Sequence, residues 1–146
     1  MAHAGQELEG PNGFRLKLVT TGVETGGDLL EMEAHYAGHG DLPPEHFHPS
    51  QVERFEVLEG AVRLVIDGEE RRHDAGATFE VPAGTRHQMA GDGPARVRWE
   101  TRPALRTAEF FERLYRALAS DSGEAATVPA ILEEFRDEVV LLPASG

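Results

Sequence analysis

Two histidines and a glutamate are spaced so that their side chains could bind one metal ion. His46 and His48 are two residues apart, and on an extended strand this spacing puts both imidazole rings on one face. Glu53 follows His48 by five residues, an odd number that would send its carboxylate to the opposite face of an unbroken strand. Pro49 and Ser50 can reset the alternation, because proline has no N–H for a sheet ladder and usually marks a turn, bulge or edge. We therefore expect both imidazoles and the carboxylate to share a face.

A fourth candidate ligand, His87, lies further along the chain. It follows a short run, Thr78 to Val81, and the turn signal Pro82-Ala83-Gly84. Neutral imidazoles and a carboxylate suit one divalent first-row transition metal, such as Fe, Mn, Ni, Cu or Zn. Four protein ligands on an ion that accepts roughly five or six leave an open position for water, dioxygen or a substrate oxygen, and such a position distinguishes a catalytic site from a structural one. An isolated His-x-His pair is more often a surface feature, so this interpretation depends on all four residues together.

These two stretches resemble the two signature motifs of the cupin superfamily. The first reads Gly40, five residues, His46-Phe47-His48, four residues, Glu53, six residues, Gly60, and the second reads Gly76, five residues, Pro82-Ala83-Gly84, two residues, His87. The resemblance implies a small β-barrel with a metal held by His46, His48, Glu53 and His87. One position departs from the family pattern, because the second motif often has an asparagine four residues after its histidine and this chain has Gly91. That position is not a usual metal ligand, so the departure concerns the local turn.

Length and charge limit the class of protein. The chain has 146 residues, which suits one domain with a single hydrophobic core. Its 14 Lys and Arg against 26 Asp and Glu give a formal net charge of -12. This charge repels phosphate backbones and anionic lipid surfaces, so we expect neither nucleic-acid nor membrane binding. The absence of cysteine excludes disulfides and thiolate metal sites.

The cellular location and the assembly follow less directly. No apolar run approaches a membrane span or a signal-peptide core, which favours a cytoplasmic protein. The expected partner is a small-molecule ligand or substrate. The oligomeric state stays open, with a homodimer among the alternatives.

Alternating hydrophobic residues predict a cupin-type barrel, of the double-stranded β-helix or jelly-roll kind, over residues 14–102. Short strands separated by turn signals about every ten residues are typical of a barrel or sandwich. The strongest hairpin signal is Asp67-Gly68, because both central positions of a type I′ turn need positive φ. Residues 1–13 are small and polar, and we expect them to be a flexible tail. The predicted strands cover residues 14–21, 29–36, 53–58, 61–66, 69–73, 78–81, 86–90 and 96–101.

The period of the pattern changes from two to 3.6 residues after Pro103, which predicts a helical extension over residues 103–146. Thr107 can cap a first helix, and a second begins near Pro129, a residue favoured in a first turn. We expect two helices within residues 107–142, joined by a polar linker at 120–126 and packed on the barrel. A partner-recruiting role is the less favoured alternative, because apolar stripes are usually buried within their own fold. The stripes are Phe110, Phe111, Leu114, Tyr115 and Leu118 in the first helix, and Ile131, Leu132, Phe135 and Val139 in the second.

The residues that share a face with the ligands predict an apolar pocket. Such a lining favours an aromatic or aliphatic molecule over a sugar phosphate, which would need inward cations, and Arg63 and Arg98 are the only candidates for that role. His35 and His39 match neither motif, and we expect them at the surface or the pocket mouth. The predicted substrate-binding residues are Phe55, Val57, Phe79, Met89 and Trp99.

The leading hypothesis is a metal-dependent small-molecule enzyme, a dioxygenase acting on an enol, phenol or diketone-type substrate. In this hypothesis Glu53 is both a metal ligand and a catalytic base, because a carboxylate beside an open metal position can accept a proton from an incoming enol or phenol. The resemblance leaves two alternatives open. One is a non-catalytic cupin that binds a metal and a small molecule, and the other is a sugar or sugar-phosphate isomerase.

Overall fold

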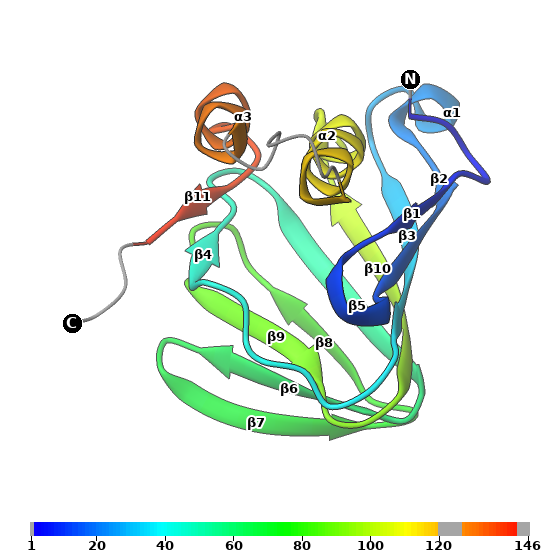
Figure 1. The fold of residues 1–146 in the computed structure, drawn as a ribbon, viewed down its shortest axis with the longest axis vertical. Helices are drawn as coiled ribbons and strands as arrows, with labels where there is room; N and C mark the ends of the chain where they lie inside the picture. Colours follow the sequence, from blue (N-terminus) through cyan, green and yellow to red (C-terminus); the bar gives the residue numbers. More distant parts are fainter. Residues whose placement is uncertain (1, 120–126, 143–146) are drawn as a thin grey trace.

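The computed structural model describes residues 2–119 and 127–142, which form two curved β-sheets with helices over one end (Figure 1). The first sheet contains, in spatial order, β1 (Glu7–Glu9), β2 (Arg15–Thr20), β3 (Leu30–Tyr36), β10 (Ala95–Arg102), β5 (Val52–Glu59) and β8 (Thr78–Val81). The second contains β11 (Val140–Leu141), β4 (His46–Phe47), β9 (His87–Gly91), β6 (Ala61–Ile66) and β7 (Glu69–Asp74). The helices are η1 (Pro11–Gly13), α1 (Gly22–Thr25), α2 (Thr107–Ala119) and α3 (Val128–Glu134). The predicted fold, mainly β of jelly-roll type with two C-terminal helices, is confirmed.

Two turns explain where strands β5, β6 and β7 begin and end. Asp67 and Gly68 have φ of 49° and 83°, the positive values that a type I′ hairpin needs, and they join β6 to β7 as predicted. Gly60 separates β5 from β6 with φ of 72°. A Cβ atom at this position would lie 2.0 Å from the carbonyl oxygen of Pro94. The motif glycine therefore meets both a backbone requirement and a close approach of another chain segment.

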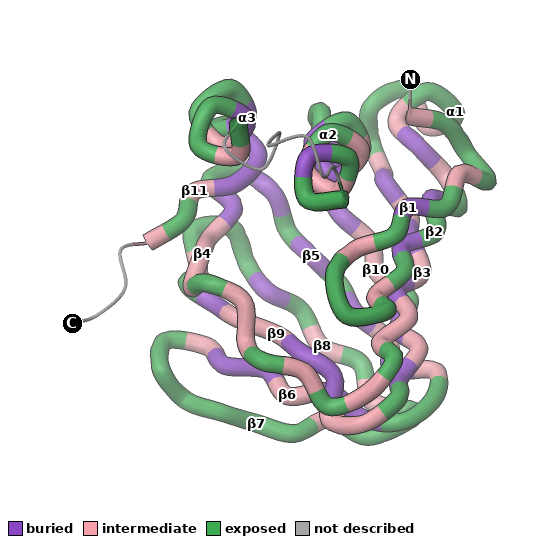
Figure 2. The backbone as a smooth tube through the Cα atoms, in the orientation of Figure 1, coloured by how far each residue is buried: buried purple, intermediate pink, exposed green. Residues whose placement is uncertain are grey.

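Strand β10 lies between β3 and β5, and its alternate residues build the barrel interior. Val97 and its two neighbours across the sheet are at most 1% exposed, and burying one such side chain contributes about 1.5–3 kcal/mol. The buried positions alternate along each of these strands (Figure 2). The inward rungs across β3, β10 and β5 are Ala34–Val97–Val57, Met32–Trp99–Phe55 and Leu30–Thr101–Glu53.

Helices α2 and α3 lie over the end of the barrel near β4 (Figure 1). α2 buries Phe110, Phe111 and Ala117, and α3 buries Ile131. Leu118, the last residue of the predicted stripe in α2, is exposed instead. The helical pattern extends to Val139, but α3 ends at Glu134 and the chain turns into β11, so the expected helix up to residue 142 is wrong there. The apolar spacing at 135–139 reflects burial in a turn, where Phe135 is fully buried. The predicted linker at 120–126 lies outside the described residues.

The N-terminal segment, expected to be a flexible tail over residues 1–13, contains a strand. β1 pairs antiparallel with β2, and Leu8 is buried between them and α2. The amide of Gln6 donates a hydrogen bond of 2.8 Å to Glu112 on α2. The short segment is thus held by a sheet edge and a helix, which composition alone does not indicate.

No helix in the described ranges is long and apolar enough to span a membrane.

Candidate metal centre and cavity

Three histidines meet where β4 and β9 run side by side. His46 on β4 and His87 on β9 are direct cross-strand partners, and their ring centroids are 4.4 Å apart. His48 follows β4 immediately, before the bend at Pro49 and Ser50, and its ring centroid lies 5.2 Å from each of the other two. One ring nitrogen from each residue falls within 4.8 Å of the others. Residues from both predicted motifs are therefore brought together.

Glu53 completes the group from β5. It is 1% exposed, and its Oε1 lies 3.0 Å from Nε2 of His48 and 3.0 Å from Nε2 of His87. Burial alternates along β5 so that Glu53 shares its inward face with Phe55 and Val57. The bend before β5 resets the alternation as the sequence predicts, and the carboxylate faces the histidines.

The opposite nitrogen of each imidazole is held by a backbone carbonyl. Nδ1 of His46 donates to Pro44 at 3.0 Å, and Nδ1 of His87 donates to Thr85 at 2.9 Å. Nδ1 of His48 donates to the carbonyl of Glu138 at 2.8 Å, although Glu138 is 90 residues away in the sequence. These bonds fix the proton on Nδ1 and leave the Nε2 lone pair free, which is the arrangement that metal-binding histidines use.

The donor atoms fit a metal ion. Nε2 of His48 and Oε1 of Glu53 are buried without a hydrogen bond to any described residue, although such groups are normally satisfied. Ligands bound to one ion at about 2.0–2.2 Å and roughly at right angles lie about 3 Å apart. The separations of 3.0 Å between Oε1 and the two Nε2 atoms match this value. A shared cation would satisfy both buried atoms at once.

The environment shifts the pKa values of the group in different directions. Burial lowers the pKa of His46 to about 4, and the neighbouring His87 lowers it further. For His48, burial also opposes the charge, but the Glu53 carboxylate and the Glu138 carbonyl outweigh it and raise the pKa. Burial would raise the pKa of Glu53, yet the two histidines beside it hold that pKa well below its usual range. The carboxylate is therefore ionised at neutral pH, and a proton competes with a metal more strongly on His48 than on His46.

Trp99 fixes the second oxygen of the glutamate. Its indole Nε1 donates a hydrogen bond of 2.7 Å to Oε2 of Glu53, which leaves Oε1 directed at the histidines. The indole stacks on Phe55, with ring centroids 5.5 Å apart, and packs edge-on against Phe111 of α2 at 5.3 Å. The ligand carboxylate is thus oriented by a ring that is itself held between barrel and helix.

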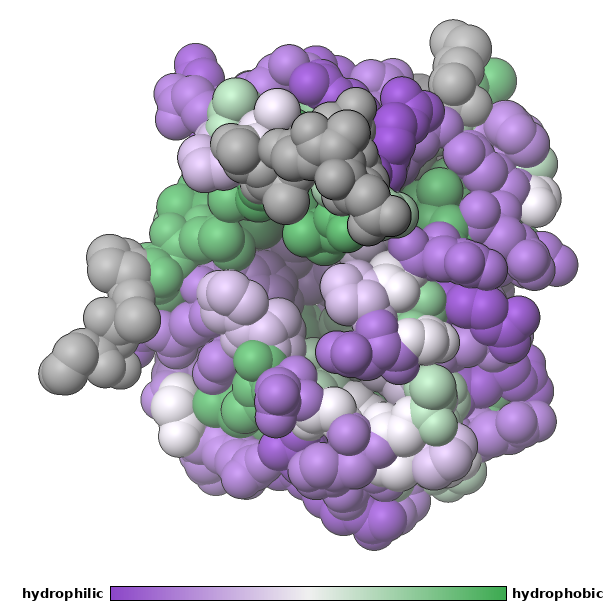
Figure 3. Space-filling model, in the orientation of Figure 1, coloured by the Kyte–Doolittle hydropathy of each residue, from purple (hydrophilic) through white to green (hydrophobic). Residues whose placement is uncertain are grey.

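His46, His48, Glu53 and His87, called the metal group below, line one wall of a large cavity between the barrel and the C-terminal helices. The cavity has a volume of about 810 Å³. No lysine or arginine is among the described residues that line it, and apolar side chains predominate. Figure 3 shows this side of the molecule, with hydrophobic surface gathered beneath α2 and α3. A mostly apolar cavity with a few polar groups is typical of a small-molecule site.

Comparison with known proteins identifies a known type of domain in this chain. The family profile described as "Cupin domain" matches residues 32–101, a span that contains all four candidate ligands. Residues 32–101 of this chain are thus a cupin domain. KdgF from a Halomonas species has a TM-score of 0.58 and 21% identity, covering 67% of this chain and 87% of that one. An RmlC-like cupin from Shewanella frigidimarina NCIMB 400 has a TM-score of 0.60 and 16% identity, covering 70% and 87%. At these identities, both similarities concern the fold alone.

A curated relative gives a closer match over a shorter span. This cupin is 35% identical over 75 residues to quercetin 2,3-dioxygenase of Bacillus subtilis (strain 168). The match covers 51% of this chain and 22% of the length of that enzyme. The name of the relative therefore describes a much longer protein.

The structure places the predicted substrate-binding residues of the cupin in different surroundings. Phe55, Met89 and Trp99 line the cavity beside the metal group. Val57 is 1% exposed within the packed core, and Phe79 stacks between Phe55 and the outer residue His73. Neither Val57 nor Phe79 is among the cavity-lining residues. Sharing a strand face with a ligand predicts an inward side chain, but it does not distinguish a packed layer from a cavity wall.

The cavity also contains residues that the sequence did not assign to it. Tyr36 at the end of β3 lines it, and so do several side chains of α2. The helical stripe signals burial, but the sequence gives no sign that the buried face is also a cavity wall. The α2 residues are Phe110, Phe111, Leu114, Tyr115 and Leu118.

The remaining candidates lie outside the cavity or at its edge. Arg63 donates to the carbonyl of Gly40, and Arg98 pairs with Glu31 at 2.8 Å, so neither supplies an inward cation. His39 is exposed and lines the cavity edge as expected.

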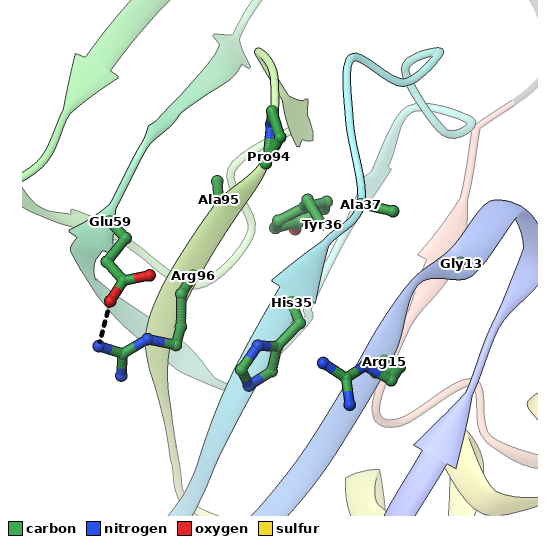
Figure 4. Close-up of a pocket in the computed structure, with 9 residues that line it drawn as sticks. All are labelled: Gly13, Arg15, His35, Tyr36, Ala37, Glu59, Pro94, Ala95 and Arg96. Atoms are coloured by element: carbon green, nitrogen blue, oxygen red, sulfur yellow. Dashed lines mark hydrogen bonds and ion pairs between the residues drawn. The ribbon is translucent and has the colours of Figure 1, made fainter.

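A second, smaller pocket of about 330 Å³ lies on the outer side of the first sheet (Figure 4). Arg15, His35 and Arg96 are cross-strand neighbours there. Arg96 of this pocket pairs with Glu59 and Glu33, each at 3.1 Å. We assign it no role in the metal chemistry.

Proposed function

We propose that this cupin is a metal-dependent dioxygenase acting on an enol, phenol or diketone-type substrate. The observation that carries the proposal is the cluster of three histidines whose ring nitrogens lie within 4.8 Å of one another. Oε1 of Glu53 lies 3.0 Å from Nε2 of His48 and of His87, and the group lies at the wall of a mostly apolar cavity. His46, His48, His87 and Glu53 would hold one divalent first-row ion. When bound, that ion would bring a substrate oxygen and dioxygen together and pass electrons between them. The partial similarity to a quercetin dioxygenase supports the same reaction class.

Glu53 is the carboxylate of the site that would accept the substrate proton. Its depressed pKa keeps it ionised at neutral pH, and the Trp99 hydrogen bond holds the carboxylate in one orientation. In the proposed step the O–H bond of the enol or phenol breaks, the proton moves to Glu53, and the electron pair stays on the substrate oxygen. The substrate then supplies the electrons that reduce dioxygen, and both oxygen atoms enter the product. No external reductant is needed.

The cavity lining favours this substrate class over sugar phosphates. A phosphate group calls for arginine or lysine donors, and no such residue is among the described residues that line the cavity. Four aromatic side chains contact or surround the space near the metal group, namely Phe55, Trp99, Phe110 and Phe111. The sugar-phosphate isomerase alternative is accordingly the weakest.

The test combines elemental analysis of the purified protein with an oxygen-electrode screen against phenols, enols and diketones. The metal-loaded protein is expected to consume dioxygen in a one-to-one ratio with its substrate. Glu53→Gln, assayed with excess metal, should lose about 10²–10⁴ in turnover because it removes the base. Glu138→Gln is the matched control, since Glu138 is a buried carboxyl that contacts His48 only through its backbone carbonyl.

Two outcomes would count against parts of this proposal. Full activity of Glu53→Gln with saturating metal would remove Glu53 from the proton transfer. A metal-loaded protein that binds a screened compound but consumes no oxygen would favour the alternative, a cupin that binds a metal and a small molecule without turnover.

A further inference from the structure

Two tyrosines line the cavity at a distance from the metal ligands. Tyr36 is the last residue of β3 and continues the inward face formed by Leu30, Met32 and Ala34. Tyr115 lies on the cavity side of α2. Both are half-buried, and both pack on Phe14, with ring centroids 5.2 Å and 5.8 Å away. Tyr36 also borders the outer pocket (Figure 4).

Neither tyrosine hydroxyl has a hydrogen-bond partner among residues 2–119 and 127–142. A tyrosine placed in an apolar setting usually finds a partner for its O–H. Burial raises the pKa of both residues, and for Tyr36 the neighbouring Tyr115 and the charge of Glu53 act in the same direction. The hydroxyls are therefore neutral donors, and they share a cavity whose other polar interior groups belong to the metal site.

The sheet register places these donors away from the metal. Tyr36 is opposite Ala95 at one end of β10, and Glu53 is opposite Thr101 near the other end. Six residues of strand correspond to about 20 Å between the backbones. The long side chains of Tyr36 and Glu53 both reach into the cavity from these levels. A molecule with one oxygen at the metal group would extend toward the tyrosines.

We propose that Tyr36 and Tyr115 form a second polar subsite that donates hydrogen bonds to an oxygen acceptor at the far end of the ligand. The cavity would thus select a flat, uncharged, two-ring aromatic molecule with oxygen at both ends. The aromatic walls match flat rings, and the lack of lining cations disfavours anions. This inference rests on the proposed function only in taking the same cavity as the ligand site.

Two matched naphthols test the subsite. 2-Naphthol has a single oxygen, and 6-methoxy-2-naphthol adds an ether acceptor at the opposite end. Their dissociation constants would be measured by calorimetry with the Zn²⁺-loaded protein under argon, where no oxidation takes place. The unmodified protein should bind the methoxy compound roughly threefold to tenfold more tightly, as expected for one added hydrogen bond.

The tyrosine variants separate hydrogen bonding from packing. Tyr36→Phe and Tyr115→Phe remove only the hydroxyls, so the double variant should lose the preference while 2-naphthol binding and zinc content stay unchanged. Phe14→Leu is the control, because it alters the ring that packs on both tyrosines without removing a donor, and it should retain the preference.

The inference is overturned if the double variant keeps the preference, if both naphthols weaken equally, or if the unmodified protein binds neither or does not distinguish them. The binding experiment involves no turnover, so its result does not depend on the result of the oxygen-uptake screen. If the unmodified protein prefers the methoxy compound and the double variant does not, while the oxygen-uptake screen is negative, the subsite is supported and the binding-protein alternative is favoured.

Discussion

The indole Nε1 of Trp99 donates a hydrogen bond of 2.7 Å to Oε2 of Glu53, while Oε1 of the same carboxylate lies 3.0 Å from the Nε2 atoms of His48 and His87. The two oxygens thus have separate tasks. One is fixed by a residue of β10, and the other is presented to the metal group. Trp99 also packs on the aromatic residues Phe55 and Phe111. Because Phe111 belongs to α2, the Trp99 ring connects the packing of this helix to the Glu53 carboxylate.

Trp99→Phe should weaken metal binding while preserving the fold. An aromatic ring remains, but the carboxylate loses the donor that orients its Oε2. Loss of such an outer partner typically costs about 10–100-fold in metal affinity, measurable by competition with a chelator. Phe79→Leu is the control, because Phe79 stacks on Phe55 but makes no bond to a ligand. Equal affinities for Trp99→Phe and the unmodified protein would show that the indole does not orient Glu53.

The C-terminal residues are expected to influence metal affinity from outside the barrel. The amide of Leu142 donates a hydrogen bond of 2.9 Å to Glu45, and β11 pairs with β4 just beside His46. Leu142→Pro removes the donor and should loosen the pairing of β11 with β4. It should also weaken the hydrogen bond between Nδ1 of His48 and the Glu138 carbonyl. We expect a several-fold loss of zinc affinity by calorimetry.

Leu142→Ala keeps the amide and serves as the matched control for the proline variant. If both variants bind zinc as tightly as the unmodified protein, the pairing of β11 with β4 does not support the site. A reduction in both would assign the effect to the leucine side chain.

Gly60→Ala should destabilise the fold strongly. The new Cβ would lie 2.0 Å from the Pro94 carbonyl oxygen, and the φ of 72° already disfavours a side chain. Overpacking and unfavourable φ together cost about 2–4 kcal/mol, read as a lower midpoint in urea. Gly68→Ala has a similar φ of 83° but nothing within 4 Å, so it should lose only about 1 kcal/mol. Similar midpoints for both variants would contradict the close approach.

Much of the fold and the clustering of the three motif histidines could be predicted because their signals are local. The type I′ dipeptide, the alternating strands and the bend at Pro49 each depend on residues close in sequence. The hydrogen bond from His48 to Glu138 spans 90 residues, and no local pattern indicates it. The cavity raises the same difficulty: Val57 and Phe55 share a strand face, yet one packs in the core and the other lines the open space.

Metal binding should release protons from the histidine group. A metal needs neutral imidazoles. The raised pKa of His48 keeps a proton on that ring up to higher pH than usual, whereas the pKa of His46 near 4 means that His46 is already neutral. Affinity should therefore fall as pH drops through the range just above the ordinary histidine pKa. Zinc calorimetry at pH 7 in two buffers of different ionisation enthalpy measures the protons released. A value near zero would contradict the raised pKa of His48.

The most direct test of the metal centre is the metal content of the chain after loading and gel filtration, measured by mass spectrometry. The unmodified protein should retain about one first-row ion per chain. The double variant His48→Ala with His87→Ala should retain almost none, while the control His35→Ala with His73→Ala, which changes two histidines outside the group, should match the unmodified protein. A chain that retains no metal, or a His48→Ala, His87→Ala variant that retains as much as the unmodified protein, would contradict the assignment.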